Sequence, residues 1–247
     1  TGNKSYTANW TANPKTPYKV VHQQMGLDGS TYTTVATENL TGTTGASITP
    51  AVKSYTGFTS PSTQTTTIAA NGSTVVTYKY TRNKYAYTLG SGTAVSTSGS
   101  TASGSYYYGS TITLKATVSA GYTWSKWTSS NTGLVGNQTT ANTTFTMPAG
   151  AITMTPSATL NTYTITYNLN GGAVSTANPT SYNVTTATFT LNNPSKTGYI
   201  FAGWTGSNGT TAQTSVSIAK GSTGNKSYTA NWTANPKTPY KVVHQQM

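Results

Sequence analysis

The first 25 residues of the chain, TGNKSYTANWTANPKTPYKVVHQQM, return letter for letter as residues 223–247. The two copies start 222 residues apart (223 − 1). A perfect copy of this length is typical of a tandem array, in which one unit recurs along the chain. The chain therefore holds slightly more than one period of 222 residues, which we call a cassette. Arrays of this kind reach, space or scaffold more often than they catalyse.

The composition favours strands. Charged residues are 6 % of the chain, against about a quarter in ordinary globular proteins. Threonine is roughly a quarter of the sequence and aromatic residues are 11 %. Threonine, valine and aromatic side chains suit pleated strands, whereas disordered chains are usually highly charged and poor in aromatics. We expect an all-β to β-rich α+β fold with an uncharged polar surface.

The net charge of +12 comes from 14 Lys and Arg against two acids, Asp28 and Glu38. Two interpretations stay open: scattered solvated lysines, or attraction to polyanions such as wall polymers, nucleic acid or acidic glycans. Arg82 is the only arginine, and no basic run is present. Because arginine dominates base and phosphate recognition, specific nucleic-acid binding is not expected.

Several absences point the same way. The chain has no cysteine, which excludes disulfides and thiolate metal sites. It shows no signal peptide and no span of about 20 apolar residues, so we expect no membrane insertion in this segment. Since Thr1 is not a natural start, we expect an internal portion of a longer polypeptide.

The clearest unit runs from about residue 162 to 234. Apolar and polar residues alternate over 163–169, which predicts a strand with one apolar face. Asn170, Gly171 and Gly172 follow and predict a turn with positive φ. The unit continues through GYIFAGW at 198–204, and its closing strand alternates at Tyr228, Ala230 and Trp232.

These blocks, YTITYNLNGG, PSKTGYIFAGWTG and YTANWT, resemble the Listeria–Bacteroides repeat, the B-type repeat of internalins. The resemblance implies a small β-grasp-like domain that occurs in long arrays on bacterial surface proteins. For the whole chain it implies tandem small domains that form an extended string.

Two further units precede it. Residues 17–83, with YKVVHQQ, LDGSTY, SYTGFTSPSTQT and ANGSTVVTYKYTRN, are similar to the mucin-binding-protein type repeat of bacterial adhesins. Residues 84–161, with GSYYYGSTITLKATVSAGYTWSKWTS and TTFTMPAGAITMT, resemble the divergent B-type repeat of bacterial surface proteins. The joints between units are a few residues long, which favours a semi-rigid string over a flexible chain.

The chain ends belong to neighbouring repeats in this interpretation. Residues 1–16 are the closing strand and linker of a preceding repeat, and 235–247 are the linker and opening strand of the next cassette. Two explanations of 1–16 stay open: an array cut out of phase, or a strand that completes another copy by strand addition.

A unit of roughly 70 residues buries a limited fraction of its surface and needs large anchors. The tryptophans of the motif strands are interpreted as core anchors, with a ligand platform as the alternative. They are Trp124, Trp127, Trp204 and Trp232.

No catalytic, cofactor or metal site is predicted, and we do not expect an enzyme. His22 and His244 occupy the same repeat position, and Asp28 lies in LDGS, where aspartate is expected for turn formation. No nucleophile-elbow motif, clustered metal ligands or Gly-rich phosphate loop is present.

Two candidate sites remain. A self-formed Lys–Asn isopeptide bond needs a carboxyl group to move protons, so only the first unit qualifies, with Glu38 and Lys19, or with Lys53 or Lys79. The second site is Tyr106-Tyr107-Tyr108, where alternate members face opposite sides of a strand. We interpret these tyrosines as strand or domain-joint residues, with glycan contact as the alternative.

The function expected is a non-catalytic structural and adhesive segment of a bacterial cell-surface protein, a stalk or extracellular fibre. The alternatives are an adhesin module for host glycan or an anionic wall polymer, and an accessory region of a large secreted enzyme. The expected partners are neighbouring repeats in the same chain, other copies in a filament, and a glycan or anionic polymer.

Overall fold

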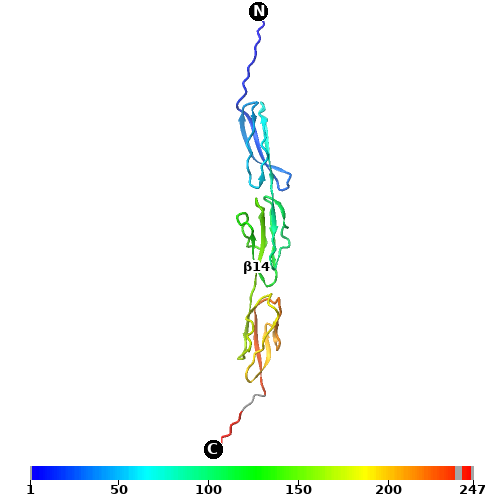
Figure 1. Cartoon of the computed structure of the whole chain (residues 1–247), viewed down its shortest axis with the longest axis vertical. Coiled ribbons are helices and arrows are strands. Elements are labelled where there is room, and N and C mark those ends of the chain that lie inside the picture. Colours follow the sequence, from blue (N-terminus) through cyan, green and yellow to red (C-terminus); the bar gives the residue numbers. More distant parts are fainter. Residues whose placement is uncertain (1, 237–240, 246–247) are drawn as a thin grey trace. The chain divides into compact units, whose positions relative to one another are not determined.

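The computed structural model describes residues 2–236 and 241–245 and shows an all-β protein (Figure 1). The described residues form strands β1–β21 and no helix, which confirms the all-β expectation. The contacts divide the chain into two compact units. Unit 1 comprises Thr1–Ser91, Thr97–Ala116 and Lys126–Pro156, and unit 2 comprises Gly92–Ser96, Thr117–Ser125 and Ser157–Met247. This division cuts through the middle sheet, so the boundaries at 83/84 and 161/162 stay predictions.

The first segment, residues 16–82, folds into a four-stranded mixed sheet in the order β2-β1-β6-β4. β1 pairs antiparallel with β2 and parallel with β6. β3 and β5 form a separate two-stranded sheet. The strands are β1 (Thr16–Met25), β2 (Tyr32–Gly42), β3 (Ser47–Ile48), β4 (Phe58–Thr59), β5 (Thr66–Thr67) and β6 (Val75–Arg82).

The middle segment, residues 84–160, contains a sheet in the order β12-β14-β7-β9. β14 runs parallel to β7, and β9 runs antiparallel to it. Two small sheets, β10-β13 and β11-β8, accompany it. The strands are β7 (Lys84–Leu89), β8 (Val95–Ser96), β9 (Gly104–Tyr107), β10 (Thr111–Leu114), β11 (Thr117–Val118), β12 (Tyr122–Ser129), β13 (Thr143–Thr146) and β14 (Ile152–Leu160).

The third segment, residues 163–234, has a five-stranded sheet in the order β16-β15-β21-β18-β19, with β17-β20 as its small sheet. The predicted turn after β15 is confirmed, because Asn170 and Gly171 both have positive φ, at 48° and 81°. The strands are β15 (Tyr163–Asn168), β16 (Ser181–Tyr182), β17 (Phe189–Thr190), β18 (Tyr199–Gly206), β19 (Gly209–Gln213), β20 (Ser217–Ile218) and β21 (Lys226–Ala234).

All three main sheets share one topology. The first and last strands of each segment lie side by side and run parallel, with the other strands outside them. Each segment therefore starts and ends at the centre of its sheet. Only Asn83 separates β6 from β7, and only Asn161 and Thr162 separate β14 from β15.

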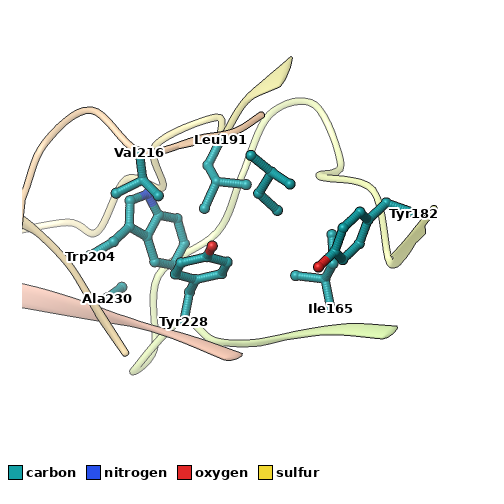
Figure 2. Close-up of a cluster of buried hydrophobic side chains, with 8 residues drawn as sticks. Ile165, Tyr182, Leu191, Trp204, Val216, Tyr228 and Ala230 are labelled. Carbon is teal, nitrogen blue, oxygen red and sulfur yellow. The ribbon is translucent and has the colours of Figure 1, made fainter. Parts of the chain in front are cut away.

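Each segment buries its own apolar side chains. In the third segment, Trp204 from β18 lies between Val216 and Ala230, with Tyr228 beside Leu191 (Figure 2). The first segment buries Val20, Val76, Tyr78 and Tyr80, and the middle segment buries Tyr87, Ile112, Leu114, Trp127 and Met154. Trp127 and Trp204 are fully buried, which confirms the core interpretation for these two, while Trp124 and Trp232 are half-buried.

The repeated sequence adopts two conformations. Residues 226–234 form β21, but their exact counterparts, residues 4–12, form no strand and are exposed. At the other end, residues 241–245 repeat part of β1 without forming a strand, and residues 237–240 of the predicted C-terminal linker lie outside the described residues. A strand of this kind needs neighbouring strands to be stable.

Candidate functional site

The three predicted tyrosines lie at the end of β9 and just after it, and all three are half-buried. Tyr106 packs edge-on against Tyr87 and donates its hydroxyl hydrogen to the Ala102 carbonyl at 2.8 Å. Tyr107 is opposite Lys84 in the β7–β9 register, and the Lys84 ammonium lies 4.5 Å from its ring centroid. Tyr106 is therefore part of the middle sheet itself.

Tyr107 and Tyr108 contact the first segment, and both contacts lie within compact unit 1. The Tyr107 hydroxyl lies against Gly29, in the turn after β1, and the Tyr108 ring lies against Gly57. A Cβ atom at Gly57 would overlap that ring, and the φ of +80° also favours glycine there. Tyr108 packs edge-on against Phe58 with ring centroids 6.1 Å apart.

Arg82 holds this junction together. Its Nε donates to the Met25 carbonyl at the end of β1, and its Nη1 donates to the Tyr108 carbonyl, both at 2.8 Å. Its guanidinium also lies 4.7 Å from the ring centroid of Phe58. The rigid fork of arginine can make these contacts at once, which the single ammonium of lysine cannot. We call Arg82, Phe58, Gly57 and Tyr108 the Arg82 junction.

Backbone hydrogen bonds support the same junction. The Asn83 amide donates to the Gly57 carbonyl at 2.9 Å, and the Tyr108 amide donates to the Asn83 carbonyl at 2.8 Å. The single residue between β6 and β7 is thus bonded on both sides. The sequence carries one signal for this site, which argued only against nucleic acid above: Arg82 is the only arginine and stands directly before a predicted boundary.

A second polar group surrounds His22, which is fully buried on β1. The backbone amide of Lys53 donates to the Tyr80 hydroxyl at 2.8 Å, so that hydroxyl in turn donates to Nδ1 of His22, also at 2.8 Å. The neutral ring therefore carries its hydrogen on Nε2. That atom lies 3.5 Å from Oε1 of Glu38 without a hydrogen bond.

Charge and burial act on this group in opposite directions. Burial lowers the pKa of His22, the Lys53 charge lowers it further, and the Glu38 carboxylate raises it. A hydrogen bond from Lys53 lowers the pKa of Glu38, and the Nζ–Oε1 distance is 2.5 Å. Burial raises the pKa of Tyr80. The result is a neutral buried histidine beside a half-exposed ion pair. Sequence alternation of Val20 and His22 on one face of β1 was the signal for its burial.

The predicted isopeptide pair is not brought together. Val20 is opposite Glu38 in the β1–β2 register, and Lys19 is opposite Asn39. Because neighbouring residues of a strand face opposite sides, Lys19 and Glu38 lie on different faces of the sheet. The lysine beside Glu38 is Lys53, and their contact is an ion pair.

Asp28 has the turn role expected of it. Its Oδ1 accepts hydrogen bonds from the amides of Ser30 and Thr31, each at 3.0 Å. Hydrogen bonding by Ser30 and Thr31 lowers the pKa of Asp28 to about 2. In the part of the chain that the structure describes, no cluster of three or more His, Asp or Glu could hold a metal ion and no cavity is present. Nor do the described residues include a helix that could cross a membrane.

Comparison with known proteins identifies two of the three segments. Residues 87–159 match the family model of the divergent InlB B-repeat domain, and residues 163–231 match that of the Listeria–Bacteroides repeat domain. No curated protein matches the chain significantly. The similarity of 17–83 to mucin-binding-protein repeats stays a prediction. Both matched families are typical of bacterial surface proteins and are generally non-catalytic. The chain therefore belongs, over these adjacent segments, to the divergent InlB B-repeat and Listeria–Bacteroides repeat families.

Proposed function

We propose that this chain is a spacer: a stalk or fibre segment, built from 222-residue cassettes, of a protein on the bacterial cell surface. The observation that carries the proposal is the repeated junction sequence. In the copy at 1–25 and in the copy at 223–247, a closing-strand sequence runs through a proline-containing joint into an opening-strand sequence. A copied junction lets cassettes follow one another in series, and a series of units sets a length.

The Arg82 junction supports this proposal from the inside of the cassette. A spacer that transmits force or keeps its length needs joints that resist bending. Here the connection is one residue, and two charge-assisted hydrogen bonds and an edge-on aromatic pair lie across it. The domain-joint role predicted for the tyrosines is part of this proposal for Tyr107 and Tyr108.

Negative-stain electron microscopy of a protein with several consecutive cassettes tests the spacer. The proposal expects thin particles of uniform length. Compact particles would contradict it. A variant with Arg82→Met in every cassette should give more strongly bent particles of the same contour length.

A second candidate is attachment to an anionic glycan or wall polymer. It is favoured by lysines that lie over aromatic rings: Lys196 is 4.4 Å from the Tyr199 ring centroid, and Lys79 is 5.1 Å from that of Tyr32. Two acids are too few to neutralise the basic side chains of the chain. Calorimetric titration of one cassette with polyglycerol phosphate tests this candidate. Saturable binding that is lost in Lys196→Ala supports it, and binding that never saturates contradicts it.

A further inference from the structure

The same ten-residue sequence occupies two environments in this chain. In β21, Tyr228 is 4 % exposed and Ala230 is fully buried, and both belong to the core of the third segment (Figure 2). Their counterparts in the N-terminal copy are Tyr6 and Ala8. Tyr6 is 86 % exposed, and Trp10, the counterpart of Trp232, is 92 % exposed. The N-terminal copy thus presents the apolar side of a core strand to solvent.

The position that β21 fills is defined on both sides by backbone pairing. β15 pairs with it in parallel, with Thr166 opposite Ser227 and Tyr167 opposite Tyr228. β18 pairs with it antiparallel over Tyr199–Gly206. Without β21, these two strands would lose their shared neighbour, and the sheet would carry two unpaired edges at its centre.

Side chains make this position selective for one sequence and one register. Nδ2 of Asn231 donates to the Gly203 carbonyl and to the Thr205 hydroxyl, each at 3.0 Å. Nε1 of Trp232 donates to the Leu169 carbonyl at 3.1 Å. A one-residue slip would move Tyr228 and Ala230 out of the core. Residues 1–12 carry the same side chain at every one of these positions, with Asn9 for Asn231 and Trp10 for Trp232.

We propose that the third sheet exchanges its last strand between copies of this chain, so that residues 2–12 of one copy occupy the β21 position of another. The exchanged strand makes every contact of the resident strand, because the sequences are identical. The resident strand has the advantage of a high effective concentration, since it is tethered to its own sheet. Exchange therefore takes place when sheets open and close again among many copies, the usual route to domain swapping.

The absence of cysteine makes the exchange measurable by a single disulfide between full-length chains. The donor chain carries Ser5→Cys and a tag that changes its size, and the acceptor chain carries Thr166→Cys. Ser5 is the counterpart of Ser227, which is opposite Thr166 in the parallel register. All three side chains are exposed, so neither substitution disturbs a core. The two chains are unfolded together in urea, refolded at high concentration and oxidised.

The proposal expects a disulfide-linked donor–acceptor dimer, in which peptide mapping finds the bond between position 5 of the donor and position 166 of the acceptor. Two controls separate exchange from collision. Tyr6→Asp in the donor places a charge where Tyr228 is buried, and it leaves the donor's own sheets intact because Tyr6 is exposed. Thr164→Cys in place of Thr166→Cys moves the acceptor thiol two residues out of register.

Each control should lower the dimer yield about tenfold, because it removes either burial or register while leaving the thiols accessible. Equal yields from matched and control pairs would overturn the proposal, as would the absence of the dimer. A shift of the yield toward intrachain pairing cannot mimic the result, since each chain carries one thiol.

Discussion

Arg82 donates a 2.8 Å hydrogen bond from Nη1 to the carbonyl oxygen of Tyr108, 26 residues further along the chain. The bond joins the last residue of the first sheet to the residue that follows β9 of the middle sheet. Because it is made to a backbone carbonyl, it depends on the arginine and not on the identity of residue 108. The mechanical properties of the connection therefore depend on one side chain.

Arg82→Met should loosen this connection. The variant loses two hydrogen bonds from a charged donor, and we expect unfolding of the first segment to become easier by about 1–3 kcal/mol. Hydrogen exchange at the Tyr108 amide and proteolysis near Asn83 should both accelerate. Lys79→Met is the matched control: it also removes a cation of β6 that lies over an aromatic ring, but away from the junction. Equal effects of the two changes would contradict the role of Arg82.

Gly57→Ala should be more damaging than Gly45→Ala. Both residues have nearly the same φ, 80° and 79°, so both changes carry a backbone cost of about 1–2 kcal/mol. Only the Cβ at 57 meets a ring, that of Tyr108, while nothing lies within 4 Å at 45. The difference between the two unfolding free energies isolates the contact. Tyr108→Ala should remove that difference, and its persistence in the double variant would exclude the ring as the cause.

Stability of the first segment should fall as the pH drops below about 6.5, the ordinary pKa of histidine. His22 has a lowered pKa in the folded state, so the folded protein holds it neutral while the unfolded chain protonates it. Its contribution is present above the unfolded pKa and is lost as the pH falls. Tyr78 and Tyr80 on β6, Glu38 on β2 and Lys53 face or adjoin the ring. Glu38 adds a second loss at lower pH, because its pKa is also lowered.

His22→Gln should flatten the pH dependence of the unfolding free energy between about pH 7 and pH 5.5, since glutamine does not titrate there. The variant should also be less stable at neutral pH, because the bond to Tyr80 is disturbed. His244→Gln makes the same change in the exposed copy of the sequence and should keep the full pH dependence. Chemical denaturation of all three proteins at each pH gives the answer. A slope that His22→Gln leaves unchanged would rule out this histidine as its source.

Trp204→Ala should unfold the third segment selectively. Removing a fully buried tryptophan leaves a cavity and costs about 3–5 kcal/mol, a large part of the stability of a small domain. Trp10→Ala deletes the same side chain where it is 92 % exposed and should change stability by less than about 0.5 kcal/mol. Hydrogen exchange resolved by segment distinguishes local from global loss. Comparable protection in both variants would mean that Trp204 is not the anchor of this core.

Local sequence patterns predicted most of the strands and the main anchors. Alternation over 163–169 and at Tyr228, Ala230 and Trp232 gave β15 and β21, because a half-buried strand repeats every two residues. The parallel pairing of these two strands, 61 residues apart at Ile165 and Lys226 (226 − 165), left no local signal. Such pairing depends on the whole segment, which is why the sheet order came only from the structure.

The candidate sites were predicted less completely. The tyrosine run was recognised, but its contacts with Gly29 and Gly57 join segments of the chain that no local pattern connects. Lys19 was named beside Glu38, whereas register places Lys53 there, on a loop that carries no periodicity. The two identical 25-residue copies also show why sequence alone was insufficient: the same residues form β21 only where β15 and β18 are present.

The central claim, that cassettes add length in series, is tested most directly by small-angle X-ray scattering from proteins with one, two and three cassettes. The measured quantity is the maximum dimension of each protein. Units in series predict equal increments, so two cassettes should measure about twice as long as one. If the cassettes instead collapsed into one compact body, doubling the chain would raise the dimension only about 1.3-fold, and that result would contradict the account.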